Sequence, residues 1–93
     1  MKVKIFWQEN CPKCPEAKKI GKEIGNELKV EYFNVDSVDG LAEASYHDIM
    51  TTPSVILVDQ FDCEIKSWRG TYPNIKELKK ERICIENKNK KNN

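Results

Sequence analysis

The sequence predicts one α/β domain built on a four-stranded mixed sheet, with helices on both faces. Three observations support this prediction. A chain of 93 residues is long enough for one small domain and too short for two. Short apolar runs alternate with helical patterns over residues 2–50, which is typical of parallel strand–helix–strand units. Two further runs, at 54–59 and 63–68, are joined too tightly for a crossover helix and therefore pair antiparallel.

The first half of the chain has the pattern of a strand, a helix and a second strand. In the segment 2–7 (KVKIFW) the residues alternate between a face expected to be fully buried and one expected to be partly buried. From Pro12 to about Leu28 apolar residues recur every three or four positions, which predicts a helix. The run 29–35 (KVEYFNV) predicts the second strand, and this order of elements makes the two strands parallel.

The second half completes the sheet. Residues 40–50 predict a short helix, and 54–59 (SVILVD) form an unbroken apolar run typical of a central strand covered on both faces. Residues 63–68 predict its antiparallel neighbour, and 74–83 have the spacing of a last helix. The expected sheet order is 2-1-3-4, with three helices distributed over both faces.

Composition and charge limit the function. The domain is expected to span residues 1–85, and the Asn/Lys-rich segment 86–93 is expected to be disordered. Lys and Arg together number 16 and Asp and Glu 15, so no basic surface for nucleic acid is predicted. The N-terminus lacks the apolar core of a secretory signal, and no run is long enough to span a membrane. We therefore expect a cytoplasmic protein with no nucleic-acid or membrane partner.

Cys11 and Cys14 are the main candidates for chemistry. They lie where the first strand leads into the first helix, and a helix N-terminus stabilises a thiolate. In a reducing compartment such a close pair is either redox-active or a metal ligand set. A four-cysteine zinc site usually contains a second close pair, whereas Cys63 and Cys84 lie far apart in the sequence. A redox pair is therefore favoured, with Cys11 attacking and Cys14, pointing toward the core, resolving.

Three segments in this context resemble the thioredoxin/glutaredoxin superfamily. They are FWQENCPKC around the cysteine pair, TTPS before the buried strand, and WRGTYPN before the last helix. The resemblance extends over residues 2–83 and is strongest to the small, glutaredoxin-sized thioredoxin-like redox proteins of archaea and bacteria. It implies a thioredoxin-like fold and a cis peptide bond before Pro53. Ile5 occupies the position where thioredoxins have a buried Asp.

The resemblance also implies the parts of the site that would contact substrate. Beside the catalytic Cys11 and Cys14, these residues are Trp7, Pro12, Lys13, Thr52, Pro53 and Gly70. The Thr52 backbone would offer hydrogen bonds to an extended substrate segment. His47 is expected to be a solvated residue on a polar helix. Cys63 and Cys84 are expected to take no part in the exchange.

The expected function is a thiol–disulfide oxidoreductase that reduces protein disulfides. Its redox group would be the Cys11–Cys14 disulfide, with no metal and no other cofactor, and it would act as a monomer. A thioredoxin-reductase-type donor would restore the reduced form. Two alternatives remain open: a dedicated electron donor to one enzyme such as a ribonucleotide reductase, and a metal-binding module that uses the two cysteines.

Overall fold

The structure, a computed structural model, describes residues 1–80. Along the chain the elements are β1 (Lys2–Trp7), α1 (Cys14–Ile24), β2 (Lys29–Asn34), α2 (Val38–Tyr46), β3 (Ser54–Val58) and β4 (Glu64–Arg69). A third helix begins at residue 75 and is described as far as residue 80. The end predicted for that helix, Cys84 and the 86–93 tail lie outside the described residues.

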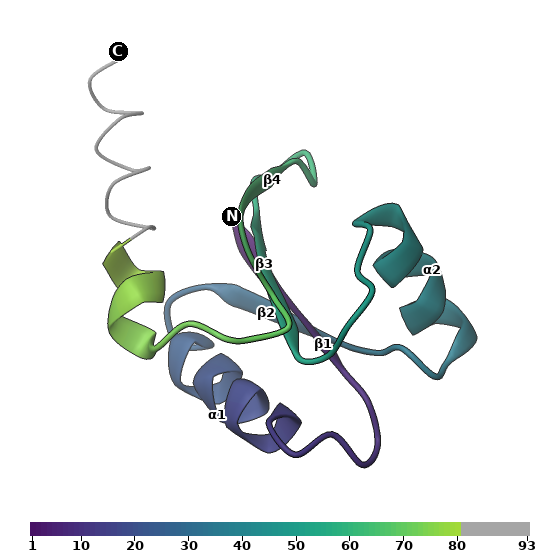
Figure 1. Ribbon diagram of the computed structural model, residues 1–93. Helices are drawn as coiled ribbons and strands as arrows, with labels where there is room; N and C mark the ends of the chain where they lie inside the picture. Colours follow the sequence, from purple (N-terminus) through teal and green to yellow (C-terminus); the bar gives the residue numbers. More distant parts are fainter. Residues whose placement is uncertain (81–93) are drawn as a thin grey trace.

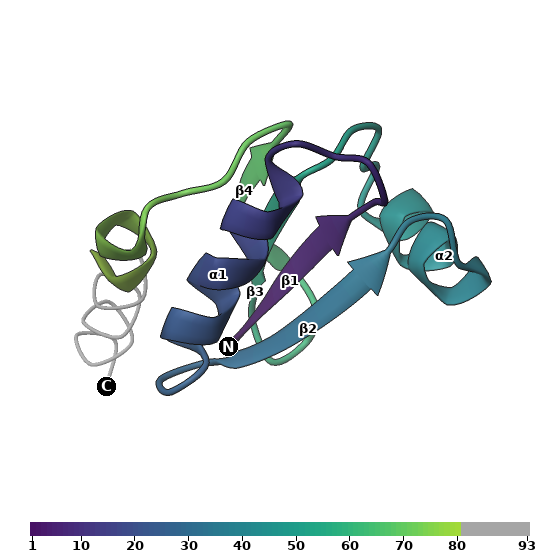
Figure 2. The ribbon, with the colours of Figure 1, turned by 90° about the horizontal axis from the view of Figure 1, so that it is seen from below.

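The four strands form one mixed sheet in the order β2-β1-β3-β4, which confirms the predicted order. β1 and β2 run parallel, and their arrowheads point the same way in Figure 2. β3 runs antiparallel to both β1 and β4. All five residues of β3 are buried, as expected for a central strand covered on both faces.

Helices cover the sheet on two sides (Figure 1). On one side, α1 and the helix at 75–80 pack on one set of alternating strand residues, and on the other side α2 packs on the opposite set. The first core consists of Val3, Ile5, Ala17, Ile24, Leu28, Val55, Leu57 and Leu78. The second consists of Phe6, Ala44, Ile49, Ile56 and Val58. Strand alternation thus divides the apolar residues between two layers.

The first helix is shorter than predicted. It begins at Cys14 rather than Pro12, because the 11–14 segment first makes a turn in which the Cys14 N–H donates to the Cys11 carbonyl at 3.3 Å. It ends at Ile24 because Gly25, a poor helix former, is the C-cap. Leu28 follows in a turn that still delivers its side chain to the core.

The second helix begins earlier and ends earlier than predicted. Ser37 is its N-cap, and its hydroxyl oxygen accepts a hydrogen bond from the Gly40 N–H at 2.9 Å. The helix ends at Tyr46, since Asp48 adopts a left-handed backbone with φ of 55°. The chain from His47 to the start of β3 is therefore a loop rather than the last turn of a helix.

Candidate active site

Cys11 lies in the connection between β1 and α1, and Cys14 is the first residue of α1. Figure 2 shows this connection leaving the end of β1 and entering α1. The two cysteines form a disulfide, with their Cα atoms 5.3 Å apart. Asn10, directly before the pair, has φ of 63°, in the left-handed region that Asn tolerates better than most residues. This turn brings both cysteines to the first turn of the helix.

The two cysteines differ in accessibility. Cys11 is half-buried, whereas Cys14 is 2% exposed. Pro12 and Lys13 between them are exposed, as predicted for Lys13. Lys13 is the N-cap, and its side chain makes no capping hydrogen bond to the first N–H groups of α1. Those N–H groups and the positive end of the helix are the elements that stabilise a thiolate at this place once the disulfide is reduced.

The loop before β3 lies beside the cysteine connection. Ser54 pairs with Phe6 across β3 and β1, so the preceding residues lie next to the residues that follow β1. The Thr52–Pro53 peptide bond is cis, Pro53 is buried and Thr52 is half-buried. The Thr52 hydroxyl donates to Gln8 Oε1 at 3.4 Å, which joins the two loops.

Gly70 belongs to a third loop at the same edge. It follows β4 and has φ of 75°, a backbone conformation that residues other than glycine rarely adopt. Its N–H donates to Ser54 Oγ at 3.2 Å, and a Cβ added there would lie 3.2 Å from Thr51 Cγ2. The loop after β4 therefore packs closely on the segment that contains Pro53.

Trp7 is held by an interaction that sequence reasoning missed. The half-buried indole ends β1, and the Lys18 ammonium lies 3.3 Å from its ring centroid. Cation–π contacts of this kind contribute about 0.5–1 kcal/mol at exposed sites. The sequence feature that could have predicted this contact is the position of Lys18, one helical turn after Cys14 on α1. One ring face of Trp7 is thus occupied by a residue of the neighbouring helix.

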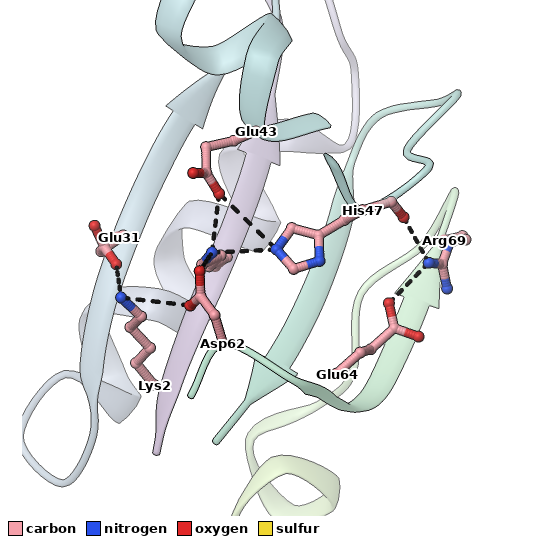
Figure 3. Close-up of polar contacts among 8 residues, drawn as sticks. Lys2, Glu31, Glu43, His47, Asp62, Glu64 and Arg69 are labelled. Carbon is pink, nitrogen blue, oxygen red and sulfur yellow. Dashed lines mark hydrogen bonds and ion pairs between the residues drawn. The ribbon is translucent and has the colours of Figure 1, made fainter. Parts of the chain in front are cut away.

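A second polar cluster lies on the opposite face of the sheet, around Lys4. The Lys4 side chain is 1% exposed, and its Nζ atom lies 2.9 Å from both Glu43 Oε2 and Asp62 Oδ2. His47 Nε2 lies 3.1 Å from the same nitrogen. Figure 3 shows Glu43, His47 and Asp62 converging from α2, the loop after α2 and the β3–β4 turn.

The prediction that His47 is solvated was wrong, because the residue is 6% exposed. The chain turns after Tyr46, and this turn places the imidazole edge-on against the Phe6 ring with centroids 6.2 Å apart. The His47 carbonyl accepts a hydrogen bond from the Arg69 guanidinium at 2.8 Å. His47 is thus part of the packing between α2 and the sheet.

Opposing effects set the charges in this cluster. Burial lowers the pKa of Lys4, but its hydrogen bonds to Glu43 and Asp62 outweigh burial and raise the pKa above 10.5. Burial is the main effect that lowers the pKa of His47 below 6.5, and the nearby Lys4 ammonium lowers it further. The oxygens and nitrogen of Glu43, His47 and Asp62 lie within 4.8 Å of one another, as metal ligands do. Lys4 Nζ is within hydrogen-bond distance of all three, so an ammonium already supplies the positive charge.

Stability should fall as the pH drops below about 6.5 because of His47. The unfolded imidazole titrates near 6.5, whereas the folded one has a lowered pKa, so the unfolded state binds more protons in this range. The loss should begin as the pH falls below about 6.5 and be complete once the pH is below the folded pKa. Guanidinium unfolding of the oxidised protein at several pH values measures it. His47 is the single histidine, so His47→Gln should flatten the dependence; an equally steep curve in that variant would contradict the assignment.

The fold and the cysteine pair together define a class of protein. A family model described as "Thioredoxin domain" matches residues 1–81, so the chain belongs to the thioredoxin domain family. With the Cys11–Cys14 disulfide at the start of α1, it is a thiol–disulfide oxidoreductase of that family.

Individual relatives agree with this membership. A thioredoxin of Methanocaldococcus jannaschii is 33% identical over 61 residues, which cover 61% of this chain and 69% of the relative. A probable thioredoxin of Archaeoglobus fulgidus is 31% identical, with 63% of this chain and 67% of the relative covered. Among solved structures, thioredoxin 1 of Thermosipho africanus has a TM-score of 0.69 at 23% identity, covering 96% of this chain and 99% of that one. The last similarity shows the fold alone.

Two further features concern the rest of the described chain. Within residues 1–80, no helix has the length and apolar character that crossing a membrane requires. Cys63 is a free, exposed thiol in the β3–β4 turn. Its predicted exclusion from the exchange remains a prediction, as does that of Cys84.

Proposed function

We propose that this protein reduces disulfides of other proteins through Cys11 and Cys14. The observation that supports the proposal best is the asymmetry of the pair at the start of α1. A half-buried Cys11 can be reached by a substrate sulfur, and a buried Cys14 can be reached only by Cys11. An attacking and a resolving thiol need this division of access.

The proposed cycle consists of two exchanges. The Cys11 thiolate attacks one sulfur of the substrate disulfide, forming a mixed disulfide and releasing the other substrate sulfur as a thiolate, which takes up a proton. The Cys14 thiol loses its proton and attacks Cys11 Sγ, which releases the first substrate sulfur. This substrate sulfur also takes up a proton, so two electrons have passed from the cysteine pair to the substrate, with one proton supplied by Cys14 and one by water, and the Cys11–Cys14 disulfide remains.

The neighbouring residues would hold the substrate. Thr52, whose peptide bond to Pro53 is cis, would present its backbone groups to an extended substrate segment, and Gly70 would allow close approach on the other side. Trp7, Pro12 and Lys13 would form the remaining wall.

The cycle needs no metal or other cofactor, since electrons pass between sulfurs. We propose a thioredoxin-reductase-type donor, a monomeric state and a cytoplasmic location.

The test is dithiothreitol-driven reduction of insulin, followed by turbidity. The protein should shorten the lag severalfold relative to dithiothreitol alone.

Protein purified without chelator should contain well under one equivalent of zinc or iron per chain, as measured by plasma emission spectrometry. Stoichiometric metal that leaves only when the cysteines are blocked, together with no effect on insulin, would favour the metal-binding alternative.

A further inference from the structure

A groove of about 560 Å³ lies beside the cysteine connection, on the α2 side of the molecule. The connection after β1, the segment after β2, α2 and the loop before β3 all contribute to it. Its lining includes Gln8, Asp36, Leu41, Asp48, Met50 and Thr52. We call it the acidic groove, because its charged lining residues are both aspartates.

The acidic groove is continuous with the site of disulfide exchange. Gln8 Nε2 donates to Asp36 Oδ1 at 3.0 Å, and Gln8 Oε1 accepts from the Thr52 hydroxyl at 3.4 Å. Gln8 lies three positions before Cys11, and Thr52 directly precedes the cis Pro53. A chain whose cysteine reacts at Cys11 can therefore extend past Thr52 into the groove.

Charge indicates what this groove accepts. Asp36 and Asp48 contribute two carboxylates, and no Lys, Arg or His is among the lining residues. Across residues 1–80, the Asp48 carboxylate has no hydrogen-bond or ion-pair partner. The Asp48 backbone is in the left-handed region, with φ of 55°. The lining of the groove thus has two carboxylates and no cationic residue, which favours a positively charged occupant.

The apolar part of the lining indicates a second requirement. Met50 is 92% exposed and Leu41 is 58% exposed, although Ile49 and Ala44 between them are buried. Exposed apolar groups around a groove are typical of binding surfaces, and Met adapts to side chains of different shape. An extended segment with one apolar and one basic side chain would match both features.

We propose that the acidic groove selects substrates with basic and apolar residues next to the reactive cysteine. The proposal rests on the proposed reduction of protein disulfides and specifies the class of substrate. The occupant is an extended segment of the substrate protein, with a Lys or Arg side chain facing Asp36 and Asp48 and an apolar one against Leu41 and Met50.

The test compares three peptides that differ only in charge. Each contains Leu and one cysteine joined by a disulfide to 2-nitro-5-thiobenzoate, and the two residues on either side of this Leu-Cys core are all Lys, all Gln or all Glu. Attack by Cys11 on the peptide sulfur releases the coloured thiolate, whose absorbance gives the rate of the first exchange by stopped flow. At low salt the Lys peptide should react about tenfold faster than the Glu peptide, with Gln between them. The ratio should shrink in 0.5 M NaCl because salt screens exposed charges.

Two variants separate the groove from the overall charge of the protein. D36N/D48N removes both carboxylates, keeps an acceptor for Gln8, and places Asn where the left-handed backbone tolerates it; the Lys-to-Glu ratio should fall to within about twofold. E23Q/E77Q makes the same change in net charge at exposed residues outside the groove and should keep the ratio. Replacing Met50 with Gln should slow all three peptides alike.

Each outcome has a distinct meaning. Equal rates for the three peptides, or an unchanged ratio in D36N/D48N, would overturn the proposal while leaving disulfide reduction intact. Failure to react with every peptide and also with a small aromatic disulfide would instead overturn the proposed function. Sedimentation analysis tests the other occupant. A dimer that Leu41→Gln dissociates, without any charge preference among the peptides, would assign the groove to a second copy of the chain and reject the substrate proposal.

Discussion

Replacing Cys11 with serine is expected to remove the whole severalfold acceleration of insulin reduction, so that only the rate of dithiothreitol alone remains. The hydroxyl is not ionised at neutral pH and cannot form the mixed disulfide, so the first exchange does not occur. Circular dichroism should show an unchanged fold, because Cys11 is half-buried at the surface rather than in the core. Substantial turnover in Cys11→Ser would refute the assignment of the nucleophile.

Cys14→Ser should abolish turnover by a different route. Cys11 keeps its position at the start of α1 and still attacks, but the resolving thiol is gone, so the mixed disulfide persists. After incubation with cell extract, non-reducing gels should show higher-mass bands that disappear with reductant. Mass spectrometry should place the bond at Cys11. Many bands would indicate a general reductase, and one dominant band a dedicated electron donor.

The control for both variants is the double change Cys63→Ser and Cys84→Ser. Cys63 is exposed in the β3–β4 turn, and Cys84 lies outside the described residues. Turnover should stay within about twofold of the unmodified protein, because the exchange needs only the closely spaced pair. A large loss of activity without loss of folding would mean that a third thiol takes part.

Lys4→Met is expected to lower the free energy of unfolding by about 2 kcal/mol. Methionine keeps an apolar stem but removes the ammonium that Glu43, His47 and Asp62 share. Removing one member of a fully buried ion pair costs about 3–5 kcal/mol. The loss should be smaller here because the two carboxylates are 33% and 38% exposed and keep part of their hydration.

Lys2→Met is the matched control. Lys2 lies two residues earlier on the same strand and also pairs with a carboxylate, Glu31, at 2.8 Å, but its side chain is 30% exposed. Exposed ion pairs contribute little, so this variant should cost no more than about 0.5 kcal/mol. Guanidinium unfolding at pH 7 measures both variants. Equal losses for Lys2 and Lys4 would show that burial of the ammonium makes no difference.

Much of the fold follows from local pattern. Alternation in β1 and the unbroken apolar run of β3 are visible in the sequence, and the connection lengths decide which strands pair parallel. The position of Cys11 and Cys14 between a strand and a helix is likewise a local property. These are the features that the sequence predicted and the structure confirms.

The remaining features depend on residues that are distant in sequence. In the sequence, Lys4 belongs to a strand face that is predicted to be partly buried. Its full burial depends on Glu43 and Asp62, which are distant in sequence and lie next to it in the fold. His47 was misjudged because helical periodicity does not reveal the left-handed turn at Asp48. The acidic groove also arises from convergence, since Asp36 and Asp48 lie on separate loops.

The position of β4 at the edge of the sheet affects where another polypeptide chain can bind by strand addition. β4 is an edge strand, and its outer side could in principle recruit another strand. Glu64, Lys66 and Arg69 along it are exposed and charged, and the pairing with β3 is irregular at Leu57/Val58. Charges and bulges on an edge discourage strand addition. Under the proposed function, a substrate chain would thereby be disfavoured from pairing along the outer side of β4.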